Sequence, residues 1–338
     1  MKRKHIILMG IAVAAALMPA CGHANDSTAM LGAGGLELVK NDSVRLARED
    51  LYLSPSEVRV RYEFVNGTKA DFESEVAFPL PDVDLSELSE VGIVNPGKDP
   101  VNFVDFSVVA DGRPVAFSGE MKAMLDGRDI TALLARHGIP VSRFDEKFYD
   151  ALDNVPGPAR KELADAGVAL WDDYGNTYPK WTMRTAYHWR QVFPAGKTVV
   201  IEHRYKPVLG LSFFSEYDLE AMHAPPEEGE EGNWVVGKEY CVDAATEAAI
   251  RRKLSRVGED QYHTLSALTL RYILTTANNW SGPIGHFRME IDKEKPGRIL
   301  SLCMDGLKKE SPALFIYEKD GFVPEKEVDL LFLDELRE

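Results

Sequence analysis

The fold class of this chain is decided by the stretch Glu57-Val58-Arg59-Val60-Arg61-Tyr62-Glu63-Phe64. Its valines and aromatic residues alternate strictly with its arginines and glutamates. A period of two places all the apolar side chains on one face of an extended strand and all the charged ones on the other. The stretch therefore predicts an antiparallel sheet with one buried face and one face in water.

The same kind of signal recurs along the chain. Residues 72–78 alternate in the same way, and Pro79 and Pro81 end that strand because proline has no N–H for a central ladder. Asp111-Gly112 is typical of a two-residue hairpin turn, in which both residues need a positive φ. Further strands are predicted at 103–109, 113–118, 265–276, 286–293, 299–303, 313–318 and 328–333.

A helical insert interrupts these strands at about residues 121–180. Asp243, a good capping residue, can start one more helix later in the chain. We therefore predict a mostly β protein, built as two antiparallel β-sandwich-like lobes with a helical insert. Within the insert, three segments combine helical spacing with start or stop signals: 129–138, 144–152 and 158–170.

The predicted organisation has three parts. Residues 1–24 form a signal peptide, residues 25–220 an N-terminal lobe that includes the insert, and residues 221–338 a C-terminal β lobe with one helix and a disulfide. A length of 338 residues is consistent with about two domains.

The first residues carry the clearest functional signal. A basic start, Met1 to His5, precedes an almost wholly apolar run at 6–20, and Gly22-His23-Ala24 supplies small residues for cleavage before Asn25. The run is shorter than the roughly 20 residues that a spanning helix needs. These features predict a secreted or periplasmic protein. No other run reaches 18 apolar residues, so we expect no transmembrane span after cleavage.

A second processing route stays open as a minor alternative. Met18-Pro19-Ala20-Cys21 resembles a bacterial lipoprotein box, which would attach a lipid anchor to Cys21, although Pro19 fits that pattern poorly. Cleavage at residue 24 instead removes Cys21 and leaves Cys241 and Cys303. An even pair in an exported chain predicts a disulfide, with two buried free thiols as the alternative.

Charge excludes one class of partner. The chain has 39 Lys and Arg against 54 Asp and Glu, a net charge of −15. Signal cleavage removes Lys2, Arg3 and Lys4 and takes this charge to −18. Such an acidic chain lacks the basic face that nucleic-acid binding requires. We expect no nucleic-acid partner.

No complete catalytic motif is present. The sequence has no G-x-S-x-G elbow, no H-E-x-x-H helix and no Walker A loop. Whether the protein is an enzyme stays open, with a non-enzymatic role favoured, and we predict no cofactor. The ligand, the partner and the oligomeric state are not readable from the sequence.

Two pairs of residues are candidate metal ligands. If residues 183–193 and 197–206 form a hairpin around residues 194–197, His188 lies opposite His203, and a third ligand would complete a zinc site. Asp82 and Asp84, in a loop, could ligate Ca²⁺. The alternatives are two neutral histidines at the edge of the core and a solvated turn.

A group of aromatic residues lies at the C-terminal end of the helical insert. Trp171, Tyr174, Tyr178 and Trp181 surround two aspartates, and such a group can stack on a sugar or anchor a partner. The alternative interpretation is structural: these side chains hold the insert on the sandwich.

Several motifs are distributed along the predicted mature chain. They are Asn25-Asp26-Ser27-Thr28-Ala29, residues 31–36, Phe78-Pro79-Leu80-Pro81, and residues 203–207, 272–280 and 301–303. Through these motifs the chain resembles a family of exported bacterial proteins known only as a domain of unknown function. The resemblance implies export, in a Gram-negative cell to the periplasm, and no reaction.

A looser resemblance concerns the N-terminal lobe. Phe64, Asn66, Phe78-Pro79-Leu80-Pro81 and Asp111-Gly112-Arg113 resemble the β-sandwich domain of vault and inter-α-trypsin inhibitor proteins. The chain lacks the D-x-S-x-S metal motif of the adhesion domain that follows in those proteins, so the resemblance implies a sandwich and protein contact only. We expect a binding or protein-interaction module that contacts an envelope protein or another envelope component. A polysaccharide-acting hydrolase and a metal- or small-ligand-binding protein are the alternatives.

Overall fold

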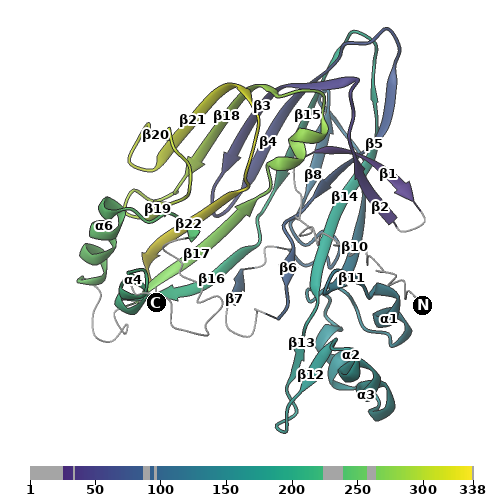
Figure 1. Ribbon diagram of the computed structural model, residues 1–338, viewed down its shortest axis with the longest axis vertical. Helices are drawn as coiled ribbons and strands as arrows, with labels where there is room; N and C mark the ends of the chain where they lie inside the picture. The colour runs from purple at the N-terminus through teal and green to yellow at the C-terminus, as the bar shows by residue number, and fades with distance from the viewer. Residues whose placement is uncertain are drawn as a thin grey trace, which may run out of the picture.

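The computed structural model describes residues 26–32, 35–86, 92–94, 97–223, 239–256 and 264–336. The predicted signal peptide and Cys21 lie outside these residues. Within them the chain is mostly β, as predicted, and its strands form three large sheets (Figure 1).

An eight-stranded sheet is the common layer of the fold. Its β4 contains the alternating stretch of the sequence, and the valines and aromatic residues of that stretch are all buried, as predicted. The β8–β9 connection is the predicted tight turn, with positive φ at Asp111 and Gly112. In order across the sheet, its strands are β20 (Lys308–Lys309), β21 (Leu314–Phe322), β18 (Ile284–Asp292), β3 (Val44–Leu53), β4 (Val58–Asn66), β15 (Thr198–Tyr205), β8 (Ser107–Ala110) and β9 (Arg113–Pro114).

A seven-stranded sheet covers one end of the inner face of this layer. Phe78 on β5 and Trp189 on β14 contact the ring of His203 on β15, so side chains of the two sheets meet in one core. Its strands are β11 (Arg128–Asp129), β10 (Ser118–Leu125), β14 (Thr182–Phe193), β5 (Phe72–Pro79), β1 (Ser27–Gly32) and β2 (Gly35–Val39), with β6 (Val83–Asp84) paired to β14.

A five-stranded sheet covers the other end of the same inner face. The hydroxyls of Tyr62 on β4 and Tyr272 on β17 lie 3.1 Å apart across this contact. The far side of the five-stranded sheet packs on α4 (Glu216–Ala221) and α6 (Ala244–Leu254). Its strands are β19 (Ile299–Ser301), β22 (Val328–Glu335), β17 (Leu265–Tyr272), β16 (Leu209–Phe214) and β7 (Gly92–Val94).

Two of these sheets contain strands from both sides of the predicted boundary after residue 220. In the eight-stranded sheet, β18 pairs in parallel with β3. In the five-stranded sheet, β17 pairs with β16. The short 3-10 helix η3 (Thr275–Asn279) follows β17 and contacts β1.

The helical insert forms a projection below the seven-stranded sheet (Figure 1). It contains α1 (Thr131–Arg136), α2 (Phe148–Asp153), α3 (Gly157–Asp165) and a small ribbon of β12 (Ala169–Trp171) and β13 (Thr177–Pro179). Gly138, which has a positive φ, follows α1 as predicted. The predicted start near residue 121 is wrong, because residues 121–125 belong to β10, in which residues 121–124 pair with β14.

Two predictions about connections have opposite outcomes. Cys241 and Cys303 form the predicted disulfide, with their Cα atoms 5.0 Å apart, which joins the entry of α6 to the end of β19. The predicted hairpin of β14 and β15 is wrong. β14 pairs with β5 and β10, whereas β15 pairs with β4 and β8, so the turn at residues 194–197 passes the chain from one sheet to the other.

Candidate functional site

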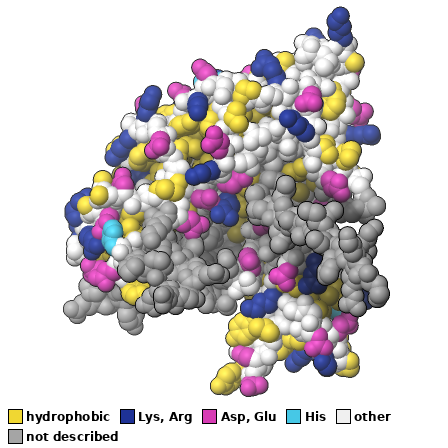
Figure 2. Space-filling model, viewed as in Figure 1, with side chains coloured by type: hydrophobic (Ala, Val, Ile, Leu, Met, Phe, Trp, Pro, Cys, Tyr) yellow, Lys and Arg dark blue, Asp and Glu magenta, His cyan; other side chains and the backbone are white. Residues whose placement is uncertain are grey.

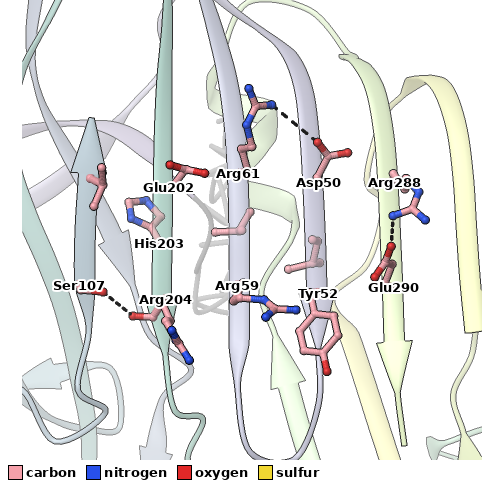
Figure 3. A pocket seen from close by; sticks show the side chains of 13 residues that line it. Asp50, Tyr52, Arg59, Arg61, Ser107, Glu202, His203, Arg204, Arg288 and Glu290 are labelled. Carbon is pink, nitrogen blue, oxygen red and sulfur yellow. Dashed lines mark hydrogen bonds and ion pairs between the residues drawn. The ribbon is translucent and has the colours of Figure 1, made fainter. Parts of the chain in front are cut away.

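The outer face of the eight-stranded sheet is hollowed over five neighbouring strands. The cavity has a volume of about 430 Å³ and is lined from β8, β15, β4, β3 and β18 (Figure 3). Because side chains alternate along each strand, this face carries the charged residues whose apolar neighbours fill the core. A volume of this size is within the range of small-ligand sites.

Strand register arranges the lining side chains in two rows that run across the sheet. In the first row, Arg204 lies opposite Arg59, and Arg59 lies opposite Tyr52. In the second row, Glu202 lies opposite Arg61, and Arg61 lies opposite Asp50. Figure 3 shows both rows, with the second above the first.

Most charges in the second row are matched within the protein. Arg61 contacts Glu63 at 2.7 Å and Asp50 at 3.8 Å. Asp50 also accepts two hydrogen bonds of 2.7 Å from Arg48, which raise the pKa of that arginine. Arg288 continues the row and pairs with Glu290 and Glu318. These groups hold one another in place.

Two arginines of the first row share one carboxylate. Both Arg204 and Arg59 pair with Glu57, the latter at 3.1 Å. The Arg59 guanidinium also lies 4.0 Å from the centre of the Tyr52 ring, a cation–π contact. Burial, and then a hydrogen bond from its hydroxyl to Asp292, raise the pKa of Tyr52 and keep it neutral. Arg59 and Arg204 therefore share one carboxylate, whereas Glu290, which lies opposite Tyr52 in the same row, pairs with Arg288.

Glu202 is the contrasting group in the hollow. Its side chain is exposed on β15, and no ion pair or hydrogen bond joins it to another side chain in the described part of the chain. Its cross-strand neighbour Arg61 turns toward Glu63 and Asp50 instead. The hollow thus presents an open carboxylate beside an arginine pair.

The structure does not bring His188 and His203 together. Tyr187 and Trp189 are buried on one face of β14, so His188 lies on the other face, where its Nδ1 is 2.6 Å from Glu75 Oε1. His203 lies inside, against Trp189. The two imidazoles are therefore on opposite faces of the β14 sheet.

His203 instead pairs with Asp26, the second residue of the predicted mature chain. The distance from His203 Nε2 to Asp26 Oδ1 is 2.9 Å, and both side chains are fully buried. The indole N–H of Trp280 donates to the Asp26 carbonyl at 2.6 Å. Burial raises the pKa of Asp26, and the neighbouring histidine opposes that shift in part. These contacts tie the first described residues into the core.

Asp82 and Asp84 are engaged by different protein groups. Asp82 pairs with Arg184 at 3.1 Å, and Asp84 accepts hydrogen bonds from the backbone N–H and the hydroxyl of Ser86. Among the residues that the structure describes, no group of three or more His, Cys, Asp or Glu side chains is arranged to hold a metal ion.

The four predicted surface aromatics have different positions. Trp181 is fully buried and donates to the Val141 carbonyl at 3.2 Å, so it belongs to the core. Trp171 is half-buried, and the Arg160 guanidinium lies over its ring, 5.4 Å from the ring centre. The Tyr178 hydroxyl donates a hydrogen bond to Asp172. Tyr174, at 92% exposure, is the member that a partner can reach, together with Leu170. Figure 2 shows hydrophobic side chains at the lower end of this projection.

One family model matches nearly the whole chain. The model of the family described as "Domain of unknown function (DUF4424)" matches residues 24–331. The chain belongs to the DUF4424 family. This confirms the predicted membership of a family without an assigned function, and the vault-type similarity stays a prediction.

No functionally curated protein matches the sequence. A crystal structure of a "putative nutrient binding protein" from Legionella pneumophila is similar with a TM-score of 0.44 and 14% identity, over 92% of this chain and 70% of that one. In the described residues, no helix has the length and hydropathy that a membrane crossing would take.

The residues of the hollow are not among the predicted site residues. Arg59 and Arg61 belong to the stretch that predicts the sheet, and the sequence predicts for them only a solvated face. Their partners Tyr52, Glu202 and Arg204 come from other strands, and only the register of β3, β4 and β15 brings them together. The one signal in the sequence for this surface is the strict alternation of charged and apolar residues at 58–64 in β4, which predicts a charged outer face.

Proposed function

We propose that this DUF4424 protein is an exported, non-enzymatic binding module of the cell envelope, and that it holds its ligand in the outer-face hollow. The observation that carries the proposal is the hollow itself: a cavity of about 430 Å³ on the solvent side of the largest sheet, lined from five strands, four of which contribute charged side chains. The opposite face of that sheet is filled by the core.

Export is supported by two features. The N-terminal sequence has the basic, apolar and small-residue regions of a signal peptide. The Cys241–Cys303 disulfide is stable in an oxidising compartment such as the periplasm. Lipid attachment at Cys21 remains the minor alternative for how the protein is held there.

Binding is favoured over hydrolysis by the state of the carboxylates. Asp50 and Glu290 in the hollow are each engaged by an arginine. A glycoside hydrolase needs two carboxyl groups free to act on the scissile bond. The arrangement holds charges in fixed positions, which suits recognition of a polar ligand, whether a small molecule or part of an envelope component.

Thermal unfolding of residues 25–338, with the disulfide intact, tests this function. The panel contains divalent ions, envelope glycans and small polar metabolites. A ligand at about 100 times its Kd adds roughly 2.7 kcal/mol, or about 4 °C for a chain of this size. We expect at least one compound to raise the Tm of the wild type and to lose that effect in Arg204→Gln.

Arg190→Gln is the matched control. Arg190 is an exposed arginine that pairs with a glutamate, Glu73, but it lies on β14 in another sheet. We expect the ligand to raise the Tm of this variant as in the wild type. A ligand that stabilises Arg204→Gln as strongly as the wild type would place the binding surface elsewhere.

A further inference from the structure

We infer that the hollow selects a zwitterion, with the anionic group of the ligand on Arg59 and Arg204 and its cationic group on Glu202. This inference rests on the proposed function and goes one step further, because it names the class of ligand. It depends on an arginine pair that shares one carboxylate and on Glu202, which lies beside one of these arginines on β15.

The anionic group of the ligand has two guanidinium partners. Arg59 and Arg204 are directly opposite each other on β4 and β15, with side chains 51% and 70% exposed, and they share Glu57. One carboxylate cannot occupy all the N–H donors of two guanidinium groups, each of which has five. The free donors match the oxygens of a carboxylate or a phosphate, which arginine binds in a bidentate manner.

The cationic group has Glu202 as its partner. This residue is two positions before Arg204 on the same strand, so the two side chains share a face and their Cα atoms are about 7 Å apart. Glu202 has no charged or hydrogen-bonding side-chain partner among the described residues, and it is exposed to the hollow. An ammonium group placed there would gain an ion pair without breaking one.

The neighbouring opposite charges favour a zwitterion over a simple ion. A free anion approaches a predicted mature chain of charge −18 and meets Glu202 beside the arginines. A free cation bound at Glu202 lies beside the guanidinium group of Arg204. A ligand that carries both groups satisfies both sites, and the strand spacing suits charges up to about 7 Å apart.

Calorimetric titration of the oxidised mature chain with matched compounds tests the inference. The zwitterions are γ-aminobutyrate and phosphoethanolamine. The anions are butyrate and inorganic phosphate, and the cations are butylamine and ethanolamine. We expect at least one zwitterion to bind tenfold or more tightly than its own singly charged relatives, and the preferred zwitterion distinguishes a carboxylate from a phosphate ligand.

Two variants assign the charges. Glu202→Gln should weaken the preferred zwitterion about tenfold while it leaves the matched anion unchanged or stronger. Arg204→Gln should weaken both the zwitterion and the anion, and Arg190→Gln neither. Thermal unfolding of each variant without ligand checks that it is folded.

The outcomes separate this inference from the proposed function. An anion that binds as tightly as the zwitterion, depends on Arg204 and ignores Glu202 would overturn the zwitterion and support the binding module. Binding of any of these compounds that is equal in the wild type and in Arg204→Gln would overturn the zwitterion and count against the hollow as the binding surface. The absence of binding by all six compounds would overturn the zwitterion, and the wider panel of the proposed function would then decide whether the hollow binds another ligand.

Discussion

His203 Nε2 lies 2.9 Å from Asp26 Oδ1, and neither side chain is exposed to solvent. The pair joins the second residue after the predicted cleavage site to a strand of the eight-stranded sheet, 177 residues away in sequence. The neighbouring residues Ser27 and Thr28 are buried as well. Residues 26–28, which follow the predicted cleavage site, are therefore part of the core.

Replacement of Asp26 should show what this pair contributes. In Asp26→Ala, the buried His203 Nε2 loses its partner, and we expect a loss of about 1–3 kcal/mol in the free energy of unfolding. Asp26→Asn keeps an acceptor and removes the charge, so it should cost less than Asp26→Ala. Urea unfolding of the two variants and the wild type measures both values, and equal costs would contradict this account.

The pH dependence of the same variants has a definite sign. Burial raises the pKa of Asp26, so the folded state binds a proton more readily than the unfolded state. The resulting stability is present below the ordinary aspartate pKa and is lost as the pH rises through the raised value. Relative to the wild type, Asp26→Asn should gain stability as the pH rises from 3.

Urea unfolding from pH 3 to pH 7 checks this trend. The difference between Asp26→Asn and the wild type should move in favour of the variant and then level off above the raised pKa. A difference that moves steadily in favour of the wild type would show that attraction to His203 outweighs the cost of burial.

Much of the fold could be predicted, because the signals are local. The alternation in β4, the Asp111-Gly112 turn and the Asp243 cap, which accepts from the Thr246 N–H at 2.7 Å, each depend on a few adjacent residues. The β14–β15 connection could not be predicted in this way. A four-residue turn between two strands fits a hairpin as well as a passage between sheets, and long-range packing decides between them.

The candidate site was harder still. The hollow depends on the register of strands from residue 50 to residue 290, including the parallel pairing of β3 with β18. The predicted pairing of His188 with His203 is wrong, because each histidine has its own carboxylate partner, Glu75 on β5 for His188 and Asp26 before β1 for His203. No local spacing connects those pairs.

Substitutions among the aromatic residues of the insert should differ in their effect on stability, according to whether the side chain is in the core or on the surface. Trp181→Ala removes a fully buried indole and should cost about 3–5 kcal/mol. Tyr174→Ala removes a side chain that is 92% exposed, and its effect should be within about 0.5 kcal/mol. Chemical denaturation measures both. A large loss of stability in Tyr174→Ala would mean that this tyrosine packs on the protein in solution.

The disulfide should stabilise the C-terminal part of the chain. It closes a loop of 62 residues, for which chain entropy suggests about 4 kcal/mol. We expect a clear fall in Tm for the double variant Cys241→Ser with Cys303→Ser, and a similar fall for the wild type after reduction. The reductant should have no effect on the variant, and an unchanged Tm on reduction would count against a stabilising bridge.

The claim that the outer-face hollow is the binding surface is tested most directly by arginine labelling. The oxidised mature chain is treated with phenylglyoxal in the presence and absence of native envelope extract, and each arginine is quantified by peptide mass spectrometry. We predict that the extract lowers the labelling of Arg59 and Arg204 at least threefold and leaves Arg190, itself 77% exposed, unchanged. Equal labelling of all three arginines with and without extract would contradict the account.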